Sequence, residues 1–125
     1  MKKILARVRD AQQLDSIRKI AAGMDCAVVP LQASDADRCL CEILEIDAGI
    51  LKRTPGRHAP VLWNMPDLLV FFAFENAALD AFLAEYRAAG LPPAALKAMV
   101  TPYNLTWSVY ELTEELQREH ESFAR

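Results

Sequence analysis

The 125-residue sequence has few of the residues that mark catalytic and metal-binding motifs. It holds only two histidines, His58 and His120, and has no glycine-rich run of the kind that wraps around a phosphate group. The spacing of its three cysteines, Cys26, Cys39 and Cys41, matches no common structural zinc pattern. The sequence therefore identifies no catalytic residue, no metal and no cofactor.

The chain also lacks a long apolar run and an excess of basic residues. Its longest uncharged apolar stretch, Leu68 to Phe74, is too short to cross a membrane. Arg7 and Arg9 interrupt the apolar start of the chain too early for an export signal, and an odd cysteine count then suggests reduced thiols in the cytoplasm. The formal net charge of -3 disfavours general nucleic-acid binding, because phosphates attract a basic surface.

The composition is that of an ordinary folded domain. Hydrophobic residues make up 53% and charged residues 25% of the sequence, and the length fits one α/β domain over residues 1–125. A chain of this length buries roughly two thirds of its unfolded surface, so its core needs no disulfide or metal for stability.

Four short segments predict β-strands. One of them is apolar without alternation, which is typical of a strand buried on both faces, so we expect it in the centre of a sheet with helices on each side. The four segments are Ile4–Val8, Cys26–Val29, Leu68–Phe74 (the central one) and Ala94–Val100.

A helix is expected after each strand. Asp10 can cap the first of them. Two pairs have the spacing of a capping box, at the second and fourth helices: Ser34 with Asp37, and Ser108 with Glu111. Three glycines stand where helices should end: Gly23, Gly49 and Gly90.

The order strand, helix, strand, helix occurs in residues 1–51 and again in residues 68–125. Residues 52–67, with three prolines and one glycine, form the connecting loop. We therefore predict a tandem βαβα repeat with a four-stranded, largely parallel sheet and flanking helices. The alternative is a ferredoxin-like α+β sandwich with an extra C-terminal helix, in which residues 31–67 form an elaborate hairpin.

The loop from Thr101 to Trp107 is the main candidate for a binding site. Asn104 offers a donor and an acceptor, and Trp107 offers a flat face with one N–H donor. The loop ends at a helix N-terminus, which favours an anion. We predict a pocket in which Asn104 orients a polar group and Trp107 stacks on it. The alternative is an Asx-turn at Asn104, with Trp107 packed under the helix.

Glu75 and Asn76 follow the central strand, so a parallel sheet would place them beside this loop, with Asp10 at the same level. Together they could bind a cation or act as an acid or base, although each is also an expected helix cap. Lys97 could be an activated amine in the last strand, or it could extend into solvent from an edge strand. The candidate ligand-binding residues are Glu75, Asn76, Thr101, Asn104 and Trp107.

The connecting loop contains two further features. His58 lies near three basic residues and could help to receive a phosphate group, or the cluster could be a solvated loop; these residues are Lys52, Arg53 and Arg57. The segment Val61–Trp63 between prolines could form an edge strand or an apolar patch for self-association. Packing of the loop against the body of the domain would explain it equally well.

From Val100 to Ser108 the chain reads V-T-P-Y-N-L-T-W-S. With the helix that ends in R-E-H, this stretch resembles the bacterial domain-of-unknown-function family numbered thirty-seven eighty-three. The resemblance extends over Leu68 to His120. Tyr103 stands where that family more often has a small polar residue. The family has no established activity, so the resemblance supports the fold unit and the importance of the loop, and says nothing about a reaction.

These observations predict a small cytoplasmic bacterial protein that works as a non-catalytic ligand-binding or protein-interaction module. Its expected partner is a small polar or anionic ligand, a second copy in a homodimer, or another protein. The alternative is an enzyme or sensor that acts on a small phosphorylated or carboxylated metabolite, with Glu75 or Lys97 as the ionisable group.

Overall fold

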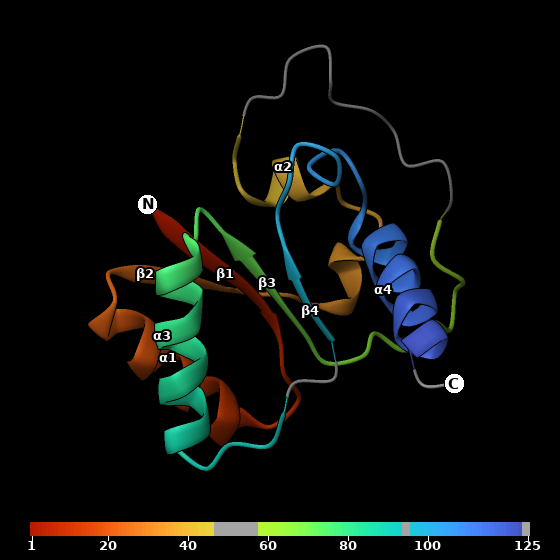
Figure 1. The fold of residues 1–125 in the computed structure, drawn as a ribbon. Coiled ribbons are helices and arrows are strands. Elements are labelled where there is room, and N and C mark those ends of the chain that lie inside the picture. Colours follow the sequence, from red (N-terminus) through yellow and green to blue (C-terminus); the bar gives the residue numbers. More distant parts are fainter. Residues whose placement is uncertain (47–57, 94–95, 124–125) are drawn as a thin grey trace. The chain divides into compact units, whose positions relative to one another are not determined.

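The structure, a computed structural model, describes residues 1–46, 58–93 and 96–123, with the side chains of the last helix described as far as Glu119. Figure 1 shows the fold, and the chain divides into two compact units. The first combines Met1–Leu31 with Asp67–Met99, and the second combines Gln32–Pro66 with Val100–Arg125. Each unit is described by itself.

The first unit contains the whole sheet and two helices. Its elements are β1 (Lys2–Arg7), α1 (Ala11–Gly23), β2 (Cys26–Pro30), β3 (Leu68–Phe72), α3 (Asn76–Ala88) and β4 (Leu96–Met99). The strand order is β2-β1-β3-β4, as Figure 1 shows. The predicted α/β fold with a four-stranded sheet is confirmed. The ferredoxin-like alternative is wrong, because β1 and β2 are neighbours and no strand lies between them.

The sheet is mixed, which corrects the expectation of a largely parallel one. β1 pairs with β2 in parallel and β3 pairs with β4 in parallel, whereas β1 and β3 run antiparallel, with Leu5 opposite Val70. A crossover helix makes the two strands that it joins parallel. The described residues between β2 and β3 contain no crossover helix of this kind, so the sequence left the direction of β3 relative to β1 open.

One face of the sheet packs against both α1 and α3. Alternate residues of a strand point to opposite faces, and Ile4 of β1 and Phe71 of β3 share a core with Ile17 of α1 and Phe82 of α3. The ring centroids of Phe71 and Phe82 lie 5.4 Å apart, nearly edge to face. Val70 points the other way and is also fully buried. The expectation that β3 is a central strand, buried on both faces, is confirmed.

Three sequence signals for helix ends in this unit can be compared with the structure, and two of them, Asp10 and Gly90, are confirmed. The Asp10 side chain accepts the N–H of Gln12 at 3.0 Å and caps α1 as predicted. Gly90 has φ 72° just after α3, which confirms its role as a left-handed end residue. Gly23 instead belongs to the last turn of α1, and Asp25 takes the left-handed conformation with φ 55°.

The described residues of the second unit form short helical pieces and one long helix. Its elements are η1 (Ala33–Asp35), α2 (Leu40–Ile43) and α4 (Val109–Phe123). The predicted capping box at Ser34 is wrong, because Gln32 donates its N–H to Asp35 Oδ2 at 2.8 Å and begins η1 two residues earlier. The predicted end of the second helix, Gly49, lies outside the described residues. None of the helices in the described part of the chain has the length and apolar character needed to cross a lipid bilayer.

Candidate functional site

The loop after β4 is closed by two hydrogen bonds between its first and fourth residues. Asn104 Oδ1 accepts the N–H of Thr101 at 2.8 Å, and the N–H of Asn104 reaches Thr101 Oγ1 at 3.2 Å. Asn104 is only 7% exposed, although Thr101 is exposed. The N–H of Leu105 adds a third bond, to the Thr101 carbonyl at 3.1 Å. The amide oxygen that could orient a ligand is therefore part of a turn.

The N-terminus of α4 is filled by groups of the protein itself. Ser108 and Glu111 form the predicted capping box: Ser108 Oγ accepts the N–H of Glu111, and Glu111 Oε1 accepts the N–H of Ser108, both at 3.1 Å. The N–H groups of Val109 and Tyr110 donate to carbonyls of Arg38 and Ala36 at 3.1 and 2.9 Å. A carboxylate already occupies the positive end of the helix dipole there.

The backbone of the same loop supports α2. The carbonyls of Trp107 and Leu105 accept the N–H groups of Leu40 and Cys41, each at 2.9 Å. Trp107 itself is half-buried. These bonds favour the structural alternative for this loop, a turn followed by a capped helix. A ligand held by Thr101, Asn104 and Trp107 stays a prediction.

Glu75 and Asn76 belong to the first unit, whereas the loop belongs to the second. Both side chains are exposed at the start of α3, and Glu75 occupies the cap position without a side-chain capping bond. Asp10 does not join them. β1 and β3 run antiparallel, so Asp10 and Glu75 follow their strands at opposite edges of the sheet. This corrects the expectation that they lie at one level.

Lys97 lies on β4, which is an edge strand, and its side chain is exposed. A buried, activated amine is therefore wrong for this residue. An exposed lysine on an edge strand discourages pairing with a further strand, as the alternative interpretation stated.

The segment from His58 to Trp63 is anchored at both ends within the second unit. At one end Asp37 Oδ1 accepts the N–H of Ala59 at 2.8 Å, and Asp37 Oδ2 lies 3.5 Å from His58 Nδ1. At the other end the Trp63 ring packs edge-on against Tyr110 of α4, with centroids 5.0 Å apart and an interplanar angle of 88°. The predicted basic cluster around His58 falls on Lys52, Arg53 and Arg57, which lie outside the described residues.

Between these anchors the chain makes a tight turn, Pro60–Trp63, which we call the apolar turn. The N–H of Trp63 donates to the Pro60 carbonyl at 2.9 Å. The two central residues of the turn, Val61 and Leu62, have relative exposures of 101% and 93%. The segment is thus not an edge strand, and its two aliphatic tips do not pack against the described part of the chain.

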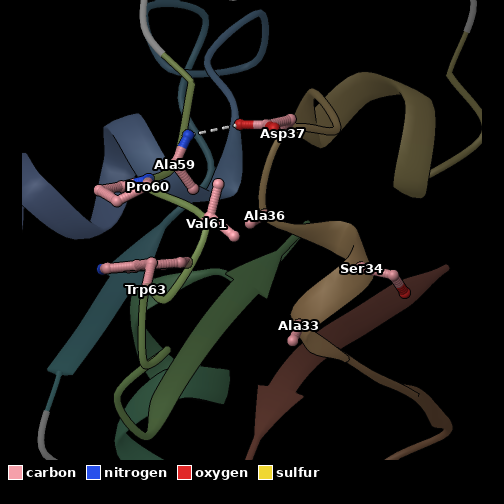
Figure 2. Close-up of a pocket in the computed structure, with 8 residues that line it drawn as sticks. All are labelled: Ala33, Ser34, Ala36, Asp37, Ala59, Pro60, Val61 and Trp63. Atoms are coloured by element: carbon pink, nitrogen blue, oxygen red, sulfur yellow. Dashed lines mark hydrogen bonds between the residues drawn. The ribbon is translucent and has the colours of Figure 1, made fainter.

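A cavity of about 260 Å³ lies beside the apolar turn. Figure 2 shows the segment Ala59–Trp63 facing the segment Ala33–Asp37, joined by the bond from Ala59 to Asp37. Sequence reasoning missed Asp37 as an anchor and Tyr110 as the partner of Trp63. Both contacts join residues more than twenty positions apart, and no local spacing marks them.

The three cysteines provide no metal site in the part of the chain that the structure describes. Cys26, Cys39 and Cys41 are buried and form no disulfide, and burial raises the pKa of the Cys26 thiol. Within the described residues, no group of three or more His, Cys, Asp or Glu side chains is arranged to hold a metal ion.

Comparison with curated proteins and with solved structures gave no match. A family model does match the region that runs from the start of β3 to the end of α4. Those two bounds coincide with the strand, helix, strand, loop and helix that carry the resemblance noted from the sequence. Residues 67–123, the C-terminal half of the chain, match the family described as Domain of unknown function (DUF3783).

Proposed function

We propose that this chain is a non-catalytic interaction module that docks a protein partner through the apolar turn. The observation that carries the proposal is the nearly complete exposure of Val61 and Leu62 beside a cavity. Single exposed apolar residues are common on protein surfaces. Two adjacent ones at the tip of a turn, where Gly, Asn, Asp or Pro is usual, mark a surface that a partner covers.

The anchoring of the turn supports the same function. Asp37 accepts a hydrogen bond from the N–H of Ala59, and the ring of Trp63 packs against the ring of Tyr110. The Tyr110 hydroxyl in turn donates to Glu114 Oε1 at 2.5 Å. Binding costs less when the contacting residues are already ordered. A turn fixed in this way presents its two aliphatic side chains to a partner with little entropy to lose.

The buried polar residues in the described part of the chain already serve in structural hydrogen bonds. The four buried polar side chains, Gln13, Asn104, Ser108 and Thr113, all make hydrogen bonds to protein groups. Both ionisable residues of the enzyme alternative, Lys97 and Glu75, have side chains exposed to solvent. An active site usually combines a concave pocket with perturbed ionisable groups. The enzyme alternative gains no support from these residues.

The proposal includes a cytoplasmic bacterial protein that arose by tandem duplication of a βαβα unit. Two parallel units, β1-α1-β2 and β3-α3-β4, support a duplication. Three buried cysteines that form no disulfide are consistent with a reducing compartment.

A second copy of the chain is the first partner to test. We would measure the mass of the wild type by light scattering after gel filtration, from about 1 μM to about 500 μM. We expect a concentration-dependent shift from 14.0 kDa towards twice that mass. The double variant Val61→Glu/Leu62→Glu should stay at the lower mass. Tyr103→Glu alters another exposed apolar residue of the same unit and should behave as the wild type.

A wild type that stays at the lower mass at all concentrations would exclude self-association. A photo-crosslinking residue at position 62, compared with one at position 103, would then test a different protein in cells. Crosslinks from position 103 but none from position 62 would reject the apolar turn as the docking surface.

A further inference from the structure

The first unit contains a cavity that neither the candidate loop nor the apolar turn uses. Its volume is about 250 Å³, and it lies between the C-terminal part of α3 and β4. Its wall is apolar and its rim is basic. The wall includes Leu69, Leu83, Leu91 and Tyr86, and the rim carries Arg87 and Lys97.

The positions of the two basic residues follow from the fold of this unit. Lys97 on β4 pairs in register with Leu69 on β3, so both side chains project from the same face of the sheet. Arg87 lies in the last turn of α3, one turn after Leu83. In the described part of the chain, neither cation forms an ion pair. Two positive charges therefore converge on an apolar wall with no carboxylate between them.

The remaining polar group of the wall is already used by the protein. The Tyr86 hydroxyl accepts from Gln13 Nε2 at 2.6 Å and donates to the Pro92 carbonyl at 2.5 Å. The nearby carboxylate of Asp67 forms an ion pair with Arg9, with 4.0 Å between Asp67 Oδ1 and Arg9 Nε. The net charge at the cavity is thus positive. Tyr86 contributes its ring to the wall, and its hydroxyl is held by these two hydrogen bonds.

Another cavity of the same unit provides a contrast. It measures about 300 Å³, and its rim carries one cation and one carboxylate, Lys19 and Glu85. Lys19 also lies 3.4 Å from Asp15 Oδ2. The positive and negative charges on the rim of this second cavity balance, so the cavity should not select an anion.

We propose that the cavity between α3 and β4 binds a small organic carboxylate. The apolar body of the ligand lies on Leu69, Leu83 and Leu91, and its carboxylate meets Lys97 and Arg87. The volume is just below the usual range of about 300–1,000 Å³ for ligand pockets, which fits a short aliphatic chain. A guanidinium fork matches the two oxygens of a carboxylate. This inference is independent of the docking function.

The test is a titration of the full chain, labelled at its leucine methyl groups, with sodium hexanoate, followed by NMR. We expect saturable shifts at Leu69, Leu83 and Leu91. Hexanamide has the same length without the charge, and acetate has the charge without the chain. Each should bind at least about fivefold more weakly than hexanoate. The absence of any saturable shift at these leucines up to about 50 mM hexanoate would overturn the proposal.

Charge variants separate this cavity from nonspecific attraction. Lys97→Gln and Arg87→Gln should each weaken hexanoate binding about three- to fivefold, since both cations are exposed. Lys19→Gln removes the cation of the other cavity and should leave binding unchanged. Equal binding of hexanoate and hexanamide would overturn the role of the cations. A loss in Lys19→Gln instead of Lys97→Gln would overturn the choice of cavity.

Discussion

Asn104 and Thr101 hold each other through a reciprocal pair of hydrogen bonds: the Asn104 amide oxygen accepts the Thr101 N–H at 2.8 Å, and the Thr101 hydroxyl accepts the Asn104 N–H at 3.2 Å. The two residues stand at the first and fourth positions of one turn. Their bonds fix the path of the chain through the loop that leads to the start of α4. The polar composition that suggested a ligand site is the composition that such a turn needs.

Asn104→Ala should therefore act on stability. The substitution removes the acceptor of the Thr101 N–H and leaves a half-buried donor without this partner. We expect the free energy of unfolding to fall by about 1–2 kcal/mol. Urea denaturation followed by circular dichroism measures it. Tyr103→Ala in the same loop removes an exposed side chain and should change stability by less than about 0.5 kcal/mol.

The same variant tests the loop as a ligand site. Thermal melting of the wild type with nucleotides, sugar phosphates, carboxylates and divalent metals would reveal any compound that binds the folded state. A rise in melting temperature that disappears in Asn104→Ala, and persists in Tyr103→Ala, would restore a ligand to this loop and contradict the structural interpretation.

The cap of α4 gives a second prediction, with a control that the chain itself offers. Ser108 is fully buried and accepts the N–H of Glu111, so Ser108→Ala should lower the free energy of unfolding by about 1 kcal/mol. Ser34→Ala should cost less than about 0.5 kcal/mol, because Ser34 is exposed and Gln32 with Asp35 caps η1 instead. Equal losses in the two variants would mean that the Ser108 cap contributes nothing specific.

These two serines show which features the sequence could predict. Each stands three residues before an acidic residue, and the spacing predicts a cap in both places. Only Ser108 precedes a long amphipathic helix, α4, and there the cap is found. At Ser34 the nearby Gln32–Asp35 pair has the same spacing and forms the cap. Local signals identify the strands, the helices and most helix ends. Where two capping signals overlap, as Gln32–Asp35 and Ser34–Asp37 do, packing decides which of them forms the cap.

Long-range pairings were not predictable in the same way. The apolar run of β3 correctly predicts a central strand. Its direction against β1 depends on the connection from β2, whose described residues form only the short helices η1 and α2. That direction separates Asp10 from Glu75 and removes one expected grouping of carboxylates. The anchors of the apolar turn, Asp37 and Tyr110, likewise come from distant parts of the chain. The flanking prolines indicate a turn there, but they do not specify these anchors or the side of the turn that faces solvent.

Tyr86 gives a prediction about alkaline pH. Burial raises the pKa of its phenol above the ordinary value of 10.0; the Gln13 hydrogen bond opposes the shift and Asp67 adds to it. A raised folded-state pKa contributes stability that is complete below 10.0 and is lost as the pH rises through the folded value. Tyr86→Phe lacks this contribution. Its stability should be about 1 kcal/mol lower near neutral pH and should then fall less than that of the wild type above pH 10 or so.

Urea denaturation between neutral pH and about pH 11 measures both effects. The comparison belongs in a Cys26→Ala background, because burial also raises the pKa of the Cys26 thiol from 9.0 and adds its own alkaline loss. Parallel stability curves for the two proteins above pH 10 would contradict the assignment of the loss to Tyr86.

The anchoring of the apolar turn gives the last prediction. Asp37→Ala removes the acceptor of the Ala59 N–H and the carboxylate beside His58. We expect amide exchange at Ala59 to become about tenfold faster, with global stability changed by less than about 1 kcal/mol because the site is exposed. Asp37→Asn keeps an amide oxygen for Ala59 and should restore most of the protection. The loosened turn should also bind its partner more weakly, since more order must then be gained on docking. Unchanged exchange at Ala59 in Asp37→Ala would show that Pro60 and Trp63 suffice to hold the turn.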